Sequence, residues 1–302
     1  MPARSDPVDV AFITVNYNTL ECVTRLSDFF GTLEVPFTFS FTVVDNDSED
    51  GSQEFLKSHP AIRYLQTGEN IGYGRAINRG VAATASKYVC VTNTDVVLNR
   101  GALIKLWEFM ESNGSADVCA PRIVYEDGRD QGMVFKPYLF SHYALWFSKL
   151  VSRYTKSLIQ RAESPVRVDG VMGAFFLIRK SAMPQPALFD EDFFFFYEDT
   201  ALAHTLKNRG RACFVIPDTT IIHIGGKSRS ESSIKFFYGN KYLYLKKFYG
   251  PFHAAMIYRL DRARIFRKWM MYELFSSLSD SERIRSKRSH YKTAWEVARR
   301  VP

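Results

Sequence analysis

Short apolar runs alternate with helical patterns through the first hundred residues, and this order constrains the fold more than any other feature. Apolar runs of strand length occur at Val10–Val15, Phe39–Val44, Ile62–Leu65 and Tyr88–Thr92. Apolar residues recur at helical spacing in Leu20–Gly31, and Ala76–Ala83 is also predicted to be helical. Strands that alternate with helices predict an α/β fold, with a mostly parallel sheet and helices on both faces.

Polar residues gather where these strands end. The residues just past the carboxyl ends of the apolar runs include Asn16, Asp45, Asn46, Asn93 and Asp95. Ligands of open α/β sheets bind at this edge, so we expect the functional site there. The sequence contains neither a GxGxxG fingerprint nor a Walker lysine motif, which disfavours a dehydrogenase-type dinucleotide fold and a P-loop.

The second half of the chain has a different pattern. We predict a strand-like segment, a helix, and two paired short strands around Pro217-Asp218, at Val166–Arg179, Glu198–Arg209, Ala212–Ile216 and Thr220–Ile224. Tyr138–Leu158 is aromatic and apolar, and is predicted to be either helical or a flexible connection. From Ser233 onward the pattern indicates helices rich in aromatic and basic residues.

Charge is distributed unevenly along the chain. It has 40 Lys and Arg against 32 Asp and Glu, a net charge of +8. From Lys227 onward there are 18 basic and 6 acidic residues, which leaves 22 basic and 26 acidic residues before it. This basic, aromatic tail predicts an anionic partner, such as a membrane surface or a phosphorylated substrate, although a helical cap with solvated charges explains it equally well. No RNA-binding motif accompanies the tail, so no nucleic acid partner is expected.

The composition is that of a globular protein, with 46% hydrophobic and 24% charged residues. The four cysteines are widely spaced and lack a C-x-x-C pair, so we expect buried thiols in a reducing compartment. The first residues carry no apolar signal core, and the longest apolar stretches fall short of the ~18 residues that span a bilayer. A cytoplasmic protein is therefore expected.

Several residues at the expected site edge are suited to ligand binding. Asp95 could hold a hard cation through oxygen, and Asp45 could contact a base or ribose, although both also suit turns. The segment Asn70–Gly80 is a glycine-bearing loop that runs into a helix. Gly72 and Gly74 in this loop would permit close backbone approach to a ligand, and Arg75 could meet a phosphate.

Two further candidates lie in the second half. Glu198 and Asp199 follow five consecutive aromatic residues at the start of a predicted helix. Desolvation beside aromatic surface would raise a carboxyl pKa and suit a general base, whereas the alternative is favourable interaction with the helix N-terminus. His223 ends an apolar strand, where it is either a satisfied core residue or a ligand of a divalent cation.

Taken together, these segments resemble the inverting glycosyltransferases of family 2, and most of all the rhamnosyltransferase-like branch that builds bacterial surface polysaccharides. The first half matches through Thr14–Asn18 (TVNYN), Val44–Gly51 (VDNDSEDG), Asn70–Gly80 (NIGYGRAINRG) and Asn93–Val96 (NTDV). The second half matches through Gly173–Arg179, Phe189–Phe193 (FDEDF), Tyr197–Asp199 (YED), Leu206–Gly210 and His223–Ser228. The similarity extends from about Val10 to Gly250.

The resemblance implies a GT-A fold, in which a Rossmann-like mixed sheet binds the nucleotide. It implies a GT-A domain over residues 8–232, with a nucleotide-binding half at about 8–100 and an acceptor or catalytic half at about 101–232. A basic helical region follows at 233–302. The resemblance further implies a nucleotide-sugar donor, a divalent metal (Mg²⁺ or Mn²⁺), and transfer to a glycan or lipid-diphosphate-linked glycan acceptor.

Residue by residue, the family's site carries over as follows. The positions matching nucleotide-sugar contacts are Thr14, Asn16, Asp45, Asn70, Gly72, Gly74, Arg75, Asn93, Thr94, Gly173, Ala174 and Lys227. Asp95 and His223 match metal ligands, with Asn93 in place of the first Asp of a D-x-D-like site. Asp199 matches the catalytic base and Glu198 its neighbour. The chain departs from many relatives at Thr200, where they carry a second acidic residue, and at Pro184–Pro186, where they carry a glycine pair.

The implied function is inverting transfer of L-rhamnose from dTDP-rhamnose in cell-surface polysaccharide synthesis, with a cytoplasmic location and a peripheral position on the inner face of the membrane. UDP- or GDP-hexose donors remain an alternative. A second alternative is a nucleotide-sugar-binding subunit without turnover, which the presence of both Asp199 and His223 disfavours. A sugar nucleotidyltransferase is disfavoured because Val10–Asn18 lacks a glycine-rich phosphate loop.

Overall fold

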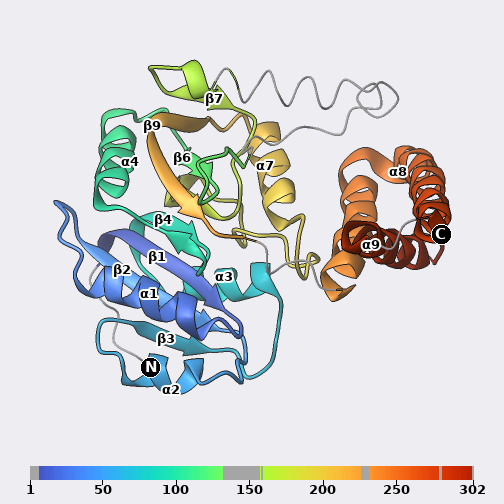
Figure 1. Cartoon of the computed structure of the whole chain (residues 1–302). Coiled ribbons are helices and arrows are strands. Elements are labelled where there is room, and N and C mark those ends of the chain that lie inside the picture. Colours follow the sequence, from blue (N-terminus) through green and yellow to red (C-terminus); the bar gives the residue numbers. More distant parts are fainter. Residues whose placement is uncertain (1–6, 132–156, 158, 226–230, 279–280, 301–302) are drawn as a thin grey trace.

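The computed structural model describes residues 7–131, 157, 159–225, 231–278 and 281–300 (Figure 1). Within these residues, nine strands form one mixed sheet in the order β3-β2-β1-β4-β8-β6-β9-β5, with β7 paired to β9. The strands are β1 (Val8–Asn16), β2 (Phe39–Asp45), β3 (Arg63–Gln66), β4 (Ser86–Thr92), β5 (Val96–Val97), β6 (Val118–Val124), β7 (Val166–Val168), β8 (Phe175–Arg179) and β9 (Cys213–His223). The helices that accompany the sheet are α1 (Leu20–Gly31), α2 (Ser52–Ser58), α3 (Tyr73–Ala82), α4 (Arg100–Ser112), the short 3-10 helix η1 (Lys180–Ala182) and α7 (Glu198–Asn208).

The first four strands in sequence form the parallel half of the sheet, as predicted. β1 pairs in parallel with β2 and β4, and β2 pairs in parallel with β3. Beyond β4 the sheet is mixed, because β8 runs antiparallel to both β4 and β6. The carboxyl ends of β1, β2 and β4 therefore meet at one edge, and β8 enters the sheet from the opposite direction.

Two predictions in the second half are wrong in detail. Residues 212–216 and 220–224 are not a pair of short strands, because β9 is one strand that runs parallel to β6. The register shifts between Pro121 and Arg122, where Ile216 and then Thr220 are the successive partners on β9. Pro217 lacks an N–H, and the Thr219 hydroxyl donates to the Ile216 carbonyl (2.8 Å), so the three extra residues bulge without ending the strand.

The predicted strand-like segment at 166–179 is two strands, β7 and β8, separated by a turn that carries Gly173. The sequence patterns also missed α2, α4 and β6. Asn99 caps α4 by accepting a hydrogen bond from the Ala102 N–H (2.8 Å). The prediction for 138–158 falls almost entirely outside the described residues.

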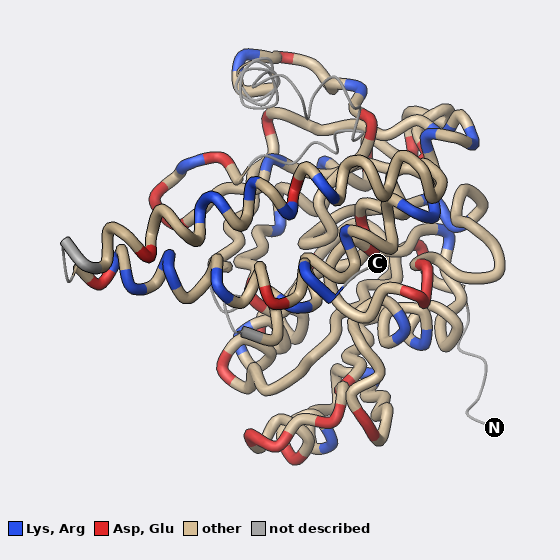
Figure 2. The backbone as a smooth tube through the Cα atoms, turned by 90° about the vertical axis from the view of Figure 1, so that its right-hand side faces the viewer, with Lys and Arg blue, Asp and Glu red and all other residues tan. Residues whose placement is uncertain are grey.

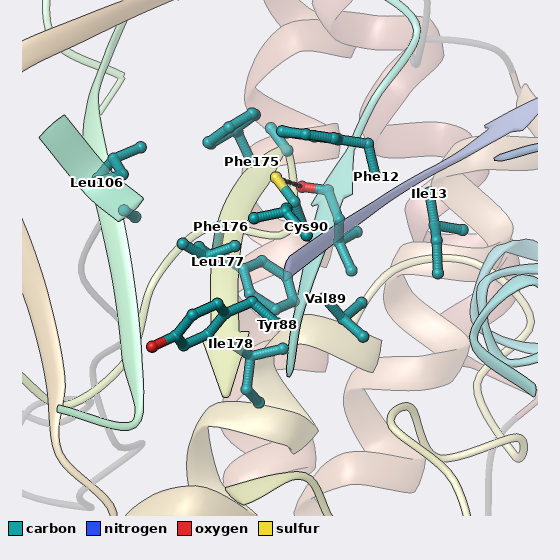
Figure 3. Packing of buried hydrophobic residues seen from close by; sticks show 14 of the residues in the cluster. Phe12, Ile13, Tyr88, Val89, Cys90, Leu106, Phe175, Phe176, Leu177 and Ile178 are labelled. Atoms are coloured by element: carbon teal, nitrogen blue, oxygen red, sulfur yellow. Dashed lines mark hydrogen bonds between the residues drawn. The ribbon is translucent and has the colours of Figure 1, made fainter. Parts of the chain in front are cut away.

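Aromatic and β-branched side chains from both halves fill the core around β1, β4 and β8 (Figure 3). Phe12, Tyr88, Phe175 and Phe176 are almost completely buried. Phe30 of α1 packs against Phe12 and stacks on Phe41 with ring centroids 4.1 Å apart. Each such side chain contributes about 1.5–3 kcal/mol when removed from water, so these rings hold α1 firmly on the sheet. All four cysteines are buried and unbridged, as predicted.

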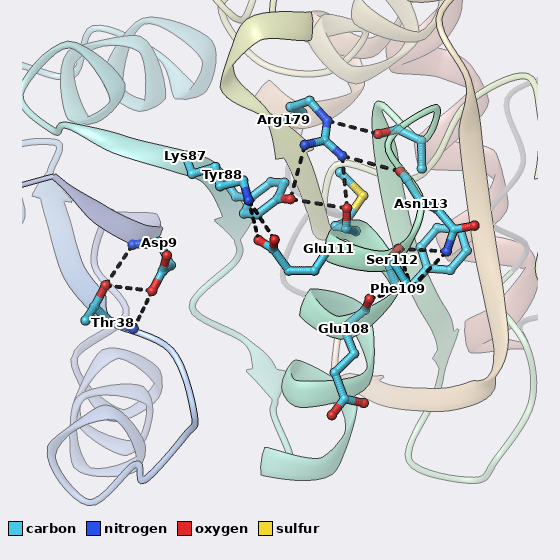
Figure 4. A network of polar contacts seen from close by, with 12 residues as sticks. Asp9, Thr38, Lys87, Tyr88, Glu108, Phe109, Glu111, Ser112, Asn113 and Arg179 are labelled. Carbon is cyan, nitrogen blue, oxygen red and sulfur yellow. Dashed lines mark hydrogen bonds and ion pairs between the residues drawn. The ribbon is translucent and has the colours of Figure 1, made fainter.

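A polar network closes the edge of the sheet at the amino end of β4 (Figure 4). The Arg179 guanidinium donates to the Tyr88 hydroxyl (3.2 Å) and to the carbonyls of Met110 (2.9 Å) and Ala116 (3.3 Å). Lys87 pairs with Glu111 nearby (2.6 Å). These bonds join β4, β8 and α4. They lie at the edge of the sheet opposite the candidate site, because the polar residues named in the sequence analysis lie at the carboxyl ends of β1, β2 and β4.

Two helices, α8 (Glu231–Leu278) and α9 (Glu282–Ala298), lie beside the sheet at the C-terminal end (Figure 1). Gly250 has a non-helical φ of 82° and Pro251 follows it, so α8 folds back on itself as two helical segments. Lys241 on the first segment and Asp261 on the second form a buried ion pair across this bend. In the described part of the chain, no helix combines the length and apolar character needed to cross a bilayer. The division into domains at residue 232 stays a prediction.

Candidate active site

The carboxyl ends of β1 and β2 are joined by a buried hydrogen-bond network. The Asn16 amide donates to Asp45 Oδ2 (2.7 Å) and to the Ser48 hydroxyl (2.9 Å), and both Asn16 and Asp45 are inaccessible to solvent. Thr19 donates to Asn16 Oδ1 (2.6 Å), and its hydroxyl lies 3.1 Å from that of Thr94. The network thus connects the ends of β1, β2 and β4 and fixes the loops that leave them.

The glycine-bearing loop before α3 is clamped onto this edge by a pair of asparagines. The Asn46 amide donates to Asn70 Oδ1 (2.8 Å), and Asn46 Oδ1 accepts from the Ile71 N–H (3.0 Å). At Gly72, φ is 87° and an added Cβ would lie 2.5 Å from the Phe194 carbonyl oxygen. Only glycine fits this position, which brings the loop into contact with the aromatic run that precedes α7.

Asp95 and His223 are brought together by the pairing of β5 with β9. Val96 lies opposite His223, and the Asp95 carbonyl accepts from the Ile224 N–H (2.9 Å). As a result, Asp95 Oδ1 lies 3.2 Å from His223 Nε2. Burial alone would raise the pKa of Asp95, but its hydrogen bond to His223, the attraction of that ring and two backbone hydrogen bonds together outweigh burial, so the pKa is lowered.

Gln131 fixes the orientation of the His223 ring. Its amide nitrogen donates to the His223 backbone carbonyl, so its Oε1 faces His223 Nδ1 at 2.7 Å. Nδ1 must then carry a proton, because Oε1 can only accept. Nε2 is left to face Asp95 either as an N–H donor or with its lone pair directed toward a cation that both residues share.

This pair fits a divalent cation whose coordination is completed by a substrate. Asp95 offers an oxygen ligand and His223 offers a nitrogen ligand. Among the described residues, no group of three or more His, Cys, Asp or Glu side chains could hold a metal, so the protein would supply only these two of its ligands. Asn93 adjoins them, with its amide nitrogen 3.5 Å from His223 Nε2. Mg²⁺ and Mn²⁺ commonly bind one or two protein carboxylates together with substrate phosphates and waters, so two protein ligands are sufficient.

Asp199, at the start of α7, is held by backbone and side-chain donors. Its Oδ2 accepts from the Gly173 N–H (3.1 Å), and its Oδ1 accepts from the N–H (2.6 Å) and hydroxyl (3.2 Å) of Thr200. A Cβ at Gly173 would lie 3.0 Å from Asp199 Cβ, so the missing side chain allows this close approach. Thr200 thus supports the carboxylate through both its N–H and its hydroxyl.

Tyr73 connects the metal-binding candidates to Asp199. Its hydroxyl donates to Asn93 Oδ1 (2.9 Å) and lies 3.4 Å from the Gly173 carbonyl oxygen. Burial, followed by the charges of Glu198, Asp199 and Asp95, raises the pKa of Tyr73 well above its ordinary value, so the hydroxyl remains a donor. The Ala174 carbonyl accepts from the Asn93 N–H (2.9 Å), which ties the turn before β8 to the end of β4.

Glu198 differs from its neighbour because its side chain is buried. Its Oε2 has no hydrogen-bond partner among the residues that the structure describes. Burial, assisted by the charge of Asp199, raises the pKa of Glu198 from 4.5 to about 8. At neutral pH Glu198 is therefore a protonated acid, and Asp199 is the better placed of the two to act as a base.

We expect Glu198 to make the stability of the fold pH-dependent. The folded-state pKa of about 8 lies above the ordinary 4.5, so the folded chain retains a proton that the unfolded chain releases. The free energy of unfolding should fall as the pH rises from about 4.5 to about 8, and Glu198→Gln should remove this part of the decline. Urea unfolding at several pH values measures it, with the exposed Glu126→Gln as control. Parallel curves for wild type and Glu198→Gln would contradict the assignment.

Two predicted ligand-binding residues do not join the group around Asp95, His223 and Asp199, and a third is not among the described residues. Thr14 is completely buried within β1, and its hydroxyl has no partner in the described part of the chain. The Arg75 side chain donates to the Glu191 carbonyl (3.0 Å) and lines a separate groove of about 560 Å³ beside Lys180. Lys227 lies outside the described residues. The roles assigned to these residues remain predictions.

Sequence reasoning missed Gln131 and Tyr73 as parts of the site, and it placed Asn46 at the site edge without assigning it a role. Tyr73 and Asn46 both lie inside motifs that the sequence analysis names, Tyr73 in Asn70–Gly80 and Asn46 in Val44–Gly51. The motifs point to the right segments but do not distinguish these two residues from their neighbours. Gln131 lies seven positions after the end of β6 and carries no local pattern. Its contact with His223 spans 92 positions and depends on how β6 and β9 pair.

Comparison with known proteins supports the GT-A fold. A mannosyltransferase from Pyrobaculum calidifontis, solved with GDP-Man and Mn²⁺, superposes with a TM-score of 0.58 and 13% identity, covering 98% of this chain and 87% of its own. GalNAc-T7, solved with UDP, GalNAc and Mn²⁺, gives a TM-score of 0.55 and 12% identity over 80% of this chain and 51% of its own. At these identities the similarity is one of fold, and it confirms the predicted fold class.

The relatives of this chain in sequence are also glycosyltransferases. An N-acetylglucosaminyl-diphospho-decaprenol L-rhamnosyltransferase of Mycobacterium tuberculosis is 26% identical over 204 residues, covering 61% of this chain and 66% of the relative, just under two thirds of its length. A low-salt glycan biosynthesis hexosyltransferase, Agl10 of Haloferax volcanii, is 26% identical over 205 residues, covering 66% of this chain and 62% of its own length. Residues 14–184, more than half of the chain, match the family described as Glycosyl transferase family 2. The chain belongs to glycosyl transferase family 2.

Proposed function

We propose that this chain transfers a sugar from a nucleotide-sugar donor to an acceptor hydroxyl, with inversion at the anomeric carbon. The observation that carries this proposal is the chain of contacts that runs from Asp199 through Gly173, Tyr73 and Asn93 to the pair His223 and Asp95. A cation-binding pair beside a fixed carboxylate provides the two functions that a single displacement needs. One offsets the charge of the leaving group, and the other accepts the proton of the nucleophile.

In this mechanism Asp199 is the general base. Oδ1 already accepts from the N–H and the hydroxyl of Thr200, whereas Oδ2 accepts only from the Gly173 N–H and retains lone-pair capacity for a substrate. Asp199 takes the acceptor hydroxyl proton as that oxygen attacks the anomeric carbon. The bond from this carbon to the diphosphate breaks, and its electron pair departs with the nucleoside diphosphate. No protein nucleophile is required, and one carboxylate suffices, in contrast to the two of glycoside hydrolases.

We assign Asp95 and His223 as the ligands of a divalent cation, Mg²⁺ or Mn²⁺. When bound, this ion offsets the negative charge of the departing diphosphate. Asp95 contributes a carboxylate oxygen, and His223 contributes Nε2 because Gln131 occupies its Nδ1. Tyr73 holds Asn93 Oδ1, which leaves the Asn93 amide nitrogen facing His223 Nε2 at 3.5 Å, so in this orientation Asn93 presents a hydrogen-bond donor and is not a ligand of the cation.

Gln131→Ala should weaken metal binding, because it frees the His223 ring from the hydrogen bond that fixes its orientation. Loss of such a partner typically costs 10–100-fold in metal affinity, and we expect a loss in this range for Mn²⁺. Titration of Mn²⁺ by electron paramagnetic resonance, in the presence of nucleoside diphosphate, measures it. The control is Gln160→Ala, an exposed glutamine bonded to the adjacent Asp130. Equal Mn²⁺ affinities for wild type and Gln131→Ala would remove this positioning role.

For the donor we propose dTDP-rhamnose, because the rhamnosyltransferase of M. tuberculosis is among the relatives of this chain. UDP- or GDP-hexoses are the alternative, which the hexosyltransferase of H. volcanii and the mannosyltransferase complex with GDP-Man favour. For the acceptor we propose a hydroxyl of a glycan or lipid-diphosphate-linked glycan. The setting would be bacterial cell-surface polysaccharide synthesis in the cytoplasm, at the inner face of the membrane.

A donor panel tests the proposal. Purified chain with Mn²⁺ or Mg²⁺ is offered dTDP-rhamnose, UDP-glucose, UDP-galactose, UDP-N-acetylglucosamine and GDP-mannose, with and without lipid-linked acceptors, and release of nucleoside diphosphate is measured. We expect release from one donor that depends on metal and acceptor. If every donor binds in a metal-dependent manner but none is turned over with any acceptor, the alternative of a non-catalytic subunit gains support. If none binds, the proposal fails.

A further inference from the structure

The second segment of α8, residues 251–278, exposes an unusual amount of apolar surface. Large hydrophobic side chains are exposed at eleven positions in the described part of the chain, and seven of these lie on this one segment: Phe252, Leu260, Phe266, Met270, Met271, Leu274 and Phe275. Phe252 is 75% exposed and Leu274 is 65% exposed. Isolated exposed apolar residues are ordinary, but a concentration of this kind indicates a surface that contacts something other than water.

These exposed side chains are not an uncovered part of the hydrophobic core. The buried side of the same segment already has partners, since Tyr258 and Ile265 pack in a cluster with Ala294 and Ala298 of α9. Ala254 and Ile257 pack in a second cluster with Tyr244 and Leu245 of the first segment. The helix is therefore covered on its inner side, and the exposed apolar face is its outer side.

Basic residues share this outer face. Positions 252, 256, 260, 263, 267, 270 and 274 recur at three- and four-residue spacing, which places Arg267 among Phe252, Leu260 and Leu274 on one side of the helix. Arg259 and Arg264 flank this row and are also exposed. None of the three arginines forms an ion pair with a residue that the structure describes. Figure 2, which looks onto the side of the molecule where α8 and α9 lie, shows Lys and Arg recurring along both helices.

Negative charge on the segment is neutralised. Its two acidic residues are Asp261, which is buried and paired with Lys241, and Glu273, which pairs with Arg288 of α9 (2.5 Å). The outer face thus combines exposed aliphatic and aromatic side chains with three arginines that form no ion pair with a described carboxylate. An anionic surface with an apolar layer beneath it is complementary to both features.

We propose that the outer face of residues 251–278 in α8, defined by Phe252, Arg259, Leu260, Arg264, Arg267 and Leu274, binds the surface of an anionic phospholipid membrane. The arginines meet lipid headgroups while Phe252, Leu260 and Leu274 enter the boundary of the acyl region. A second copy of the chain fits less well, because a two-fold contact on this face would bring like-charged arginines together. The inference rests on the proposed function only in that a lipid-linked acceptor would be presented at such a surface.

Vesicle co-sedimentation of the full chain tests this inference without any donor or acceptor. Vesicles of phosphatidylcholine alone are compared with vesicles containing about one third phosphatidylglycerol. We expect binding to the anionic vesicles, at least tenfold weaker binding to the neutral ones, and release from the anionic vesicles in 0.5 M salt. Since each basic residue near such a surface contributes about 1 kcal/mol, the variant Arg259→Gln/Arg264→Gln/Arg267→Gln should bind about 100-fold more weakly.

Matched variants keep the test specific. Phe252→Ala/Leu274→Ala removes apolar area and no charge, and we expect a loss of binding on the order of tenfold. Arg25→Gln/Lys57→Gln/Arg209→Gln removes the same charge from exposed positions elsewhere, and Tyr125→Ala removes an exposed aromatic ring elsewhere. Both controls should bind anionic vesicles like wild type. Equal losses in the arginine variant and in its charge control would mean that only net charge matters and would overturn the inference.

Two other outcomes would also overturn it. One is binding to neutral and anionic vesicles alike. The other is self-association in analytical ultracentrifugation that Phe252→Ala/Leu274→Ala abolishes, without vesicle binding by wild type, which would assign the face to a second copy. Nucleotide-sugar binding in solution, measured on the same variants, should not change. A failure of the membrane inference therefore leaves donor binding intact, whereas a failure of the proposed function leaves vesicle binding intact.

Discussion

Replacing Asp199 by asparagine should reduce kcat for glycosyl transfer by about 10²–10⁴-fold, the range that general base catalysis typically contributes. The substitution removes the group that accepts the hydroxyl proton and leaves the size of the side chain unchanged. Each Asp199 oxygen accepts from an N–H group, of Gly173 or Thr200, so one of these donors must face the new amide nitrogen. A modest loss of stability, of about 1–3 kcal/mol, should accompany the loss of rate.

Steady-state kinetics with the preferred donor, together with calorimetry of nucleotide binding, separates these effects. Metal-dependent nucleotide binding should survive in Asp199→Asn, because Asp199 does not belong to the pair that we assign to the cation. The control is Asp218→Asn, an exposed carboxylate on β9 that pairs with Lys105 (2.6 Å) and lies outside the site. A kcat within about threefold of wild type would show that Asp199 is not the base.

The second large effect is expected at Asp95. Asp95→Asn keeps the shape of the side chain but removes the negative charge that would attract the cation. In the wild-type chain this carboxylate lies 3.2 Å from His223 Nε2. Because Asn93 already supplies a neutral amide in place of the first carboxylate of the motif, the variant would have no carboxylate at this position. We expect kcat/KM to fall by about 10²–10³-fold, which is the scale of losing one preorganised electrostatic contact.

Metal titration distinguishes this prediction from a general loss of activity. The Mn²⁺ concentration that gives half-maximal rate should rise at least tenfold in Asp95→Asn, whereas in Asp199→Asn it should remain near the wild-type value. The Mn²⁺ concentration that supports nucleotide binding by Asp95→Asn should rise by a similar factor. An unchanged metal requirement in Asp95→Asn would place the cation elsewhere and would leave His223 as a structural residue.

The parallel half of the sheet could be predicted from the sequence because its signals are local. β1, β2 and β4 are apolar runs bounded by Asn or Asp, and the carboxyl ends of parallel strands meet at one edge regardless of details elsewhere. Asn16, Asp45, Asn93 and Asp95 were placed at this edge on that ground alone. The pairing of Asp95 with His223 followed from the family resemblance, because no local pattern connects positions so far apart in the chain.

The remaining features depend on packing that the sequence does not encode locally. β9 was divided in two because Pro217 is a strong local signal, whereas pairing with β6 on both sides of the bulge maintains one strand. Arg75 was expected at a phosphate, but its side chain contacts the Glu191 carbonyl instead. Glu198 and Asp199 are adjacent in sequence and share one motif, yet only the structure separates a buried acid from a carboxylate held by donors.

The bend of α8 at Gly250 sets a limit on where this chain can be shortened. Asn240 donates to the carbonyls of Phe195 (2.9 Å) and Phe196 (3.1 Å), in the aromatic run that leads into Asp199. The adjacent Lys241 pairs with Asp261 beyond the bend. A chain cut after residue 250 would keep every side chain assigned to the reaction and Asn240 itself, but it would lose Asp261, whose buried ion pair with Lys241 holds the first segment of α8 against the second. We therefore expect the C-terminal helices to support the proposed active site, and a chain that ends before residue 261 to lose activity.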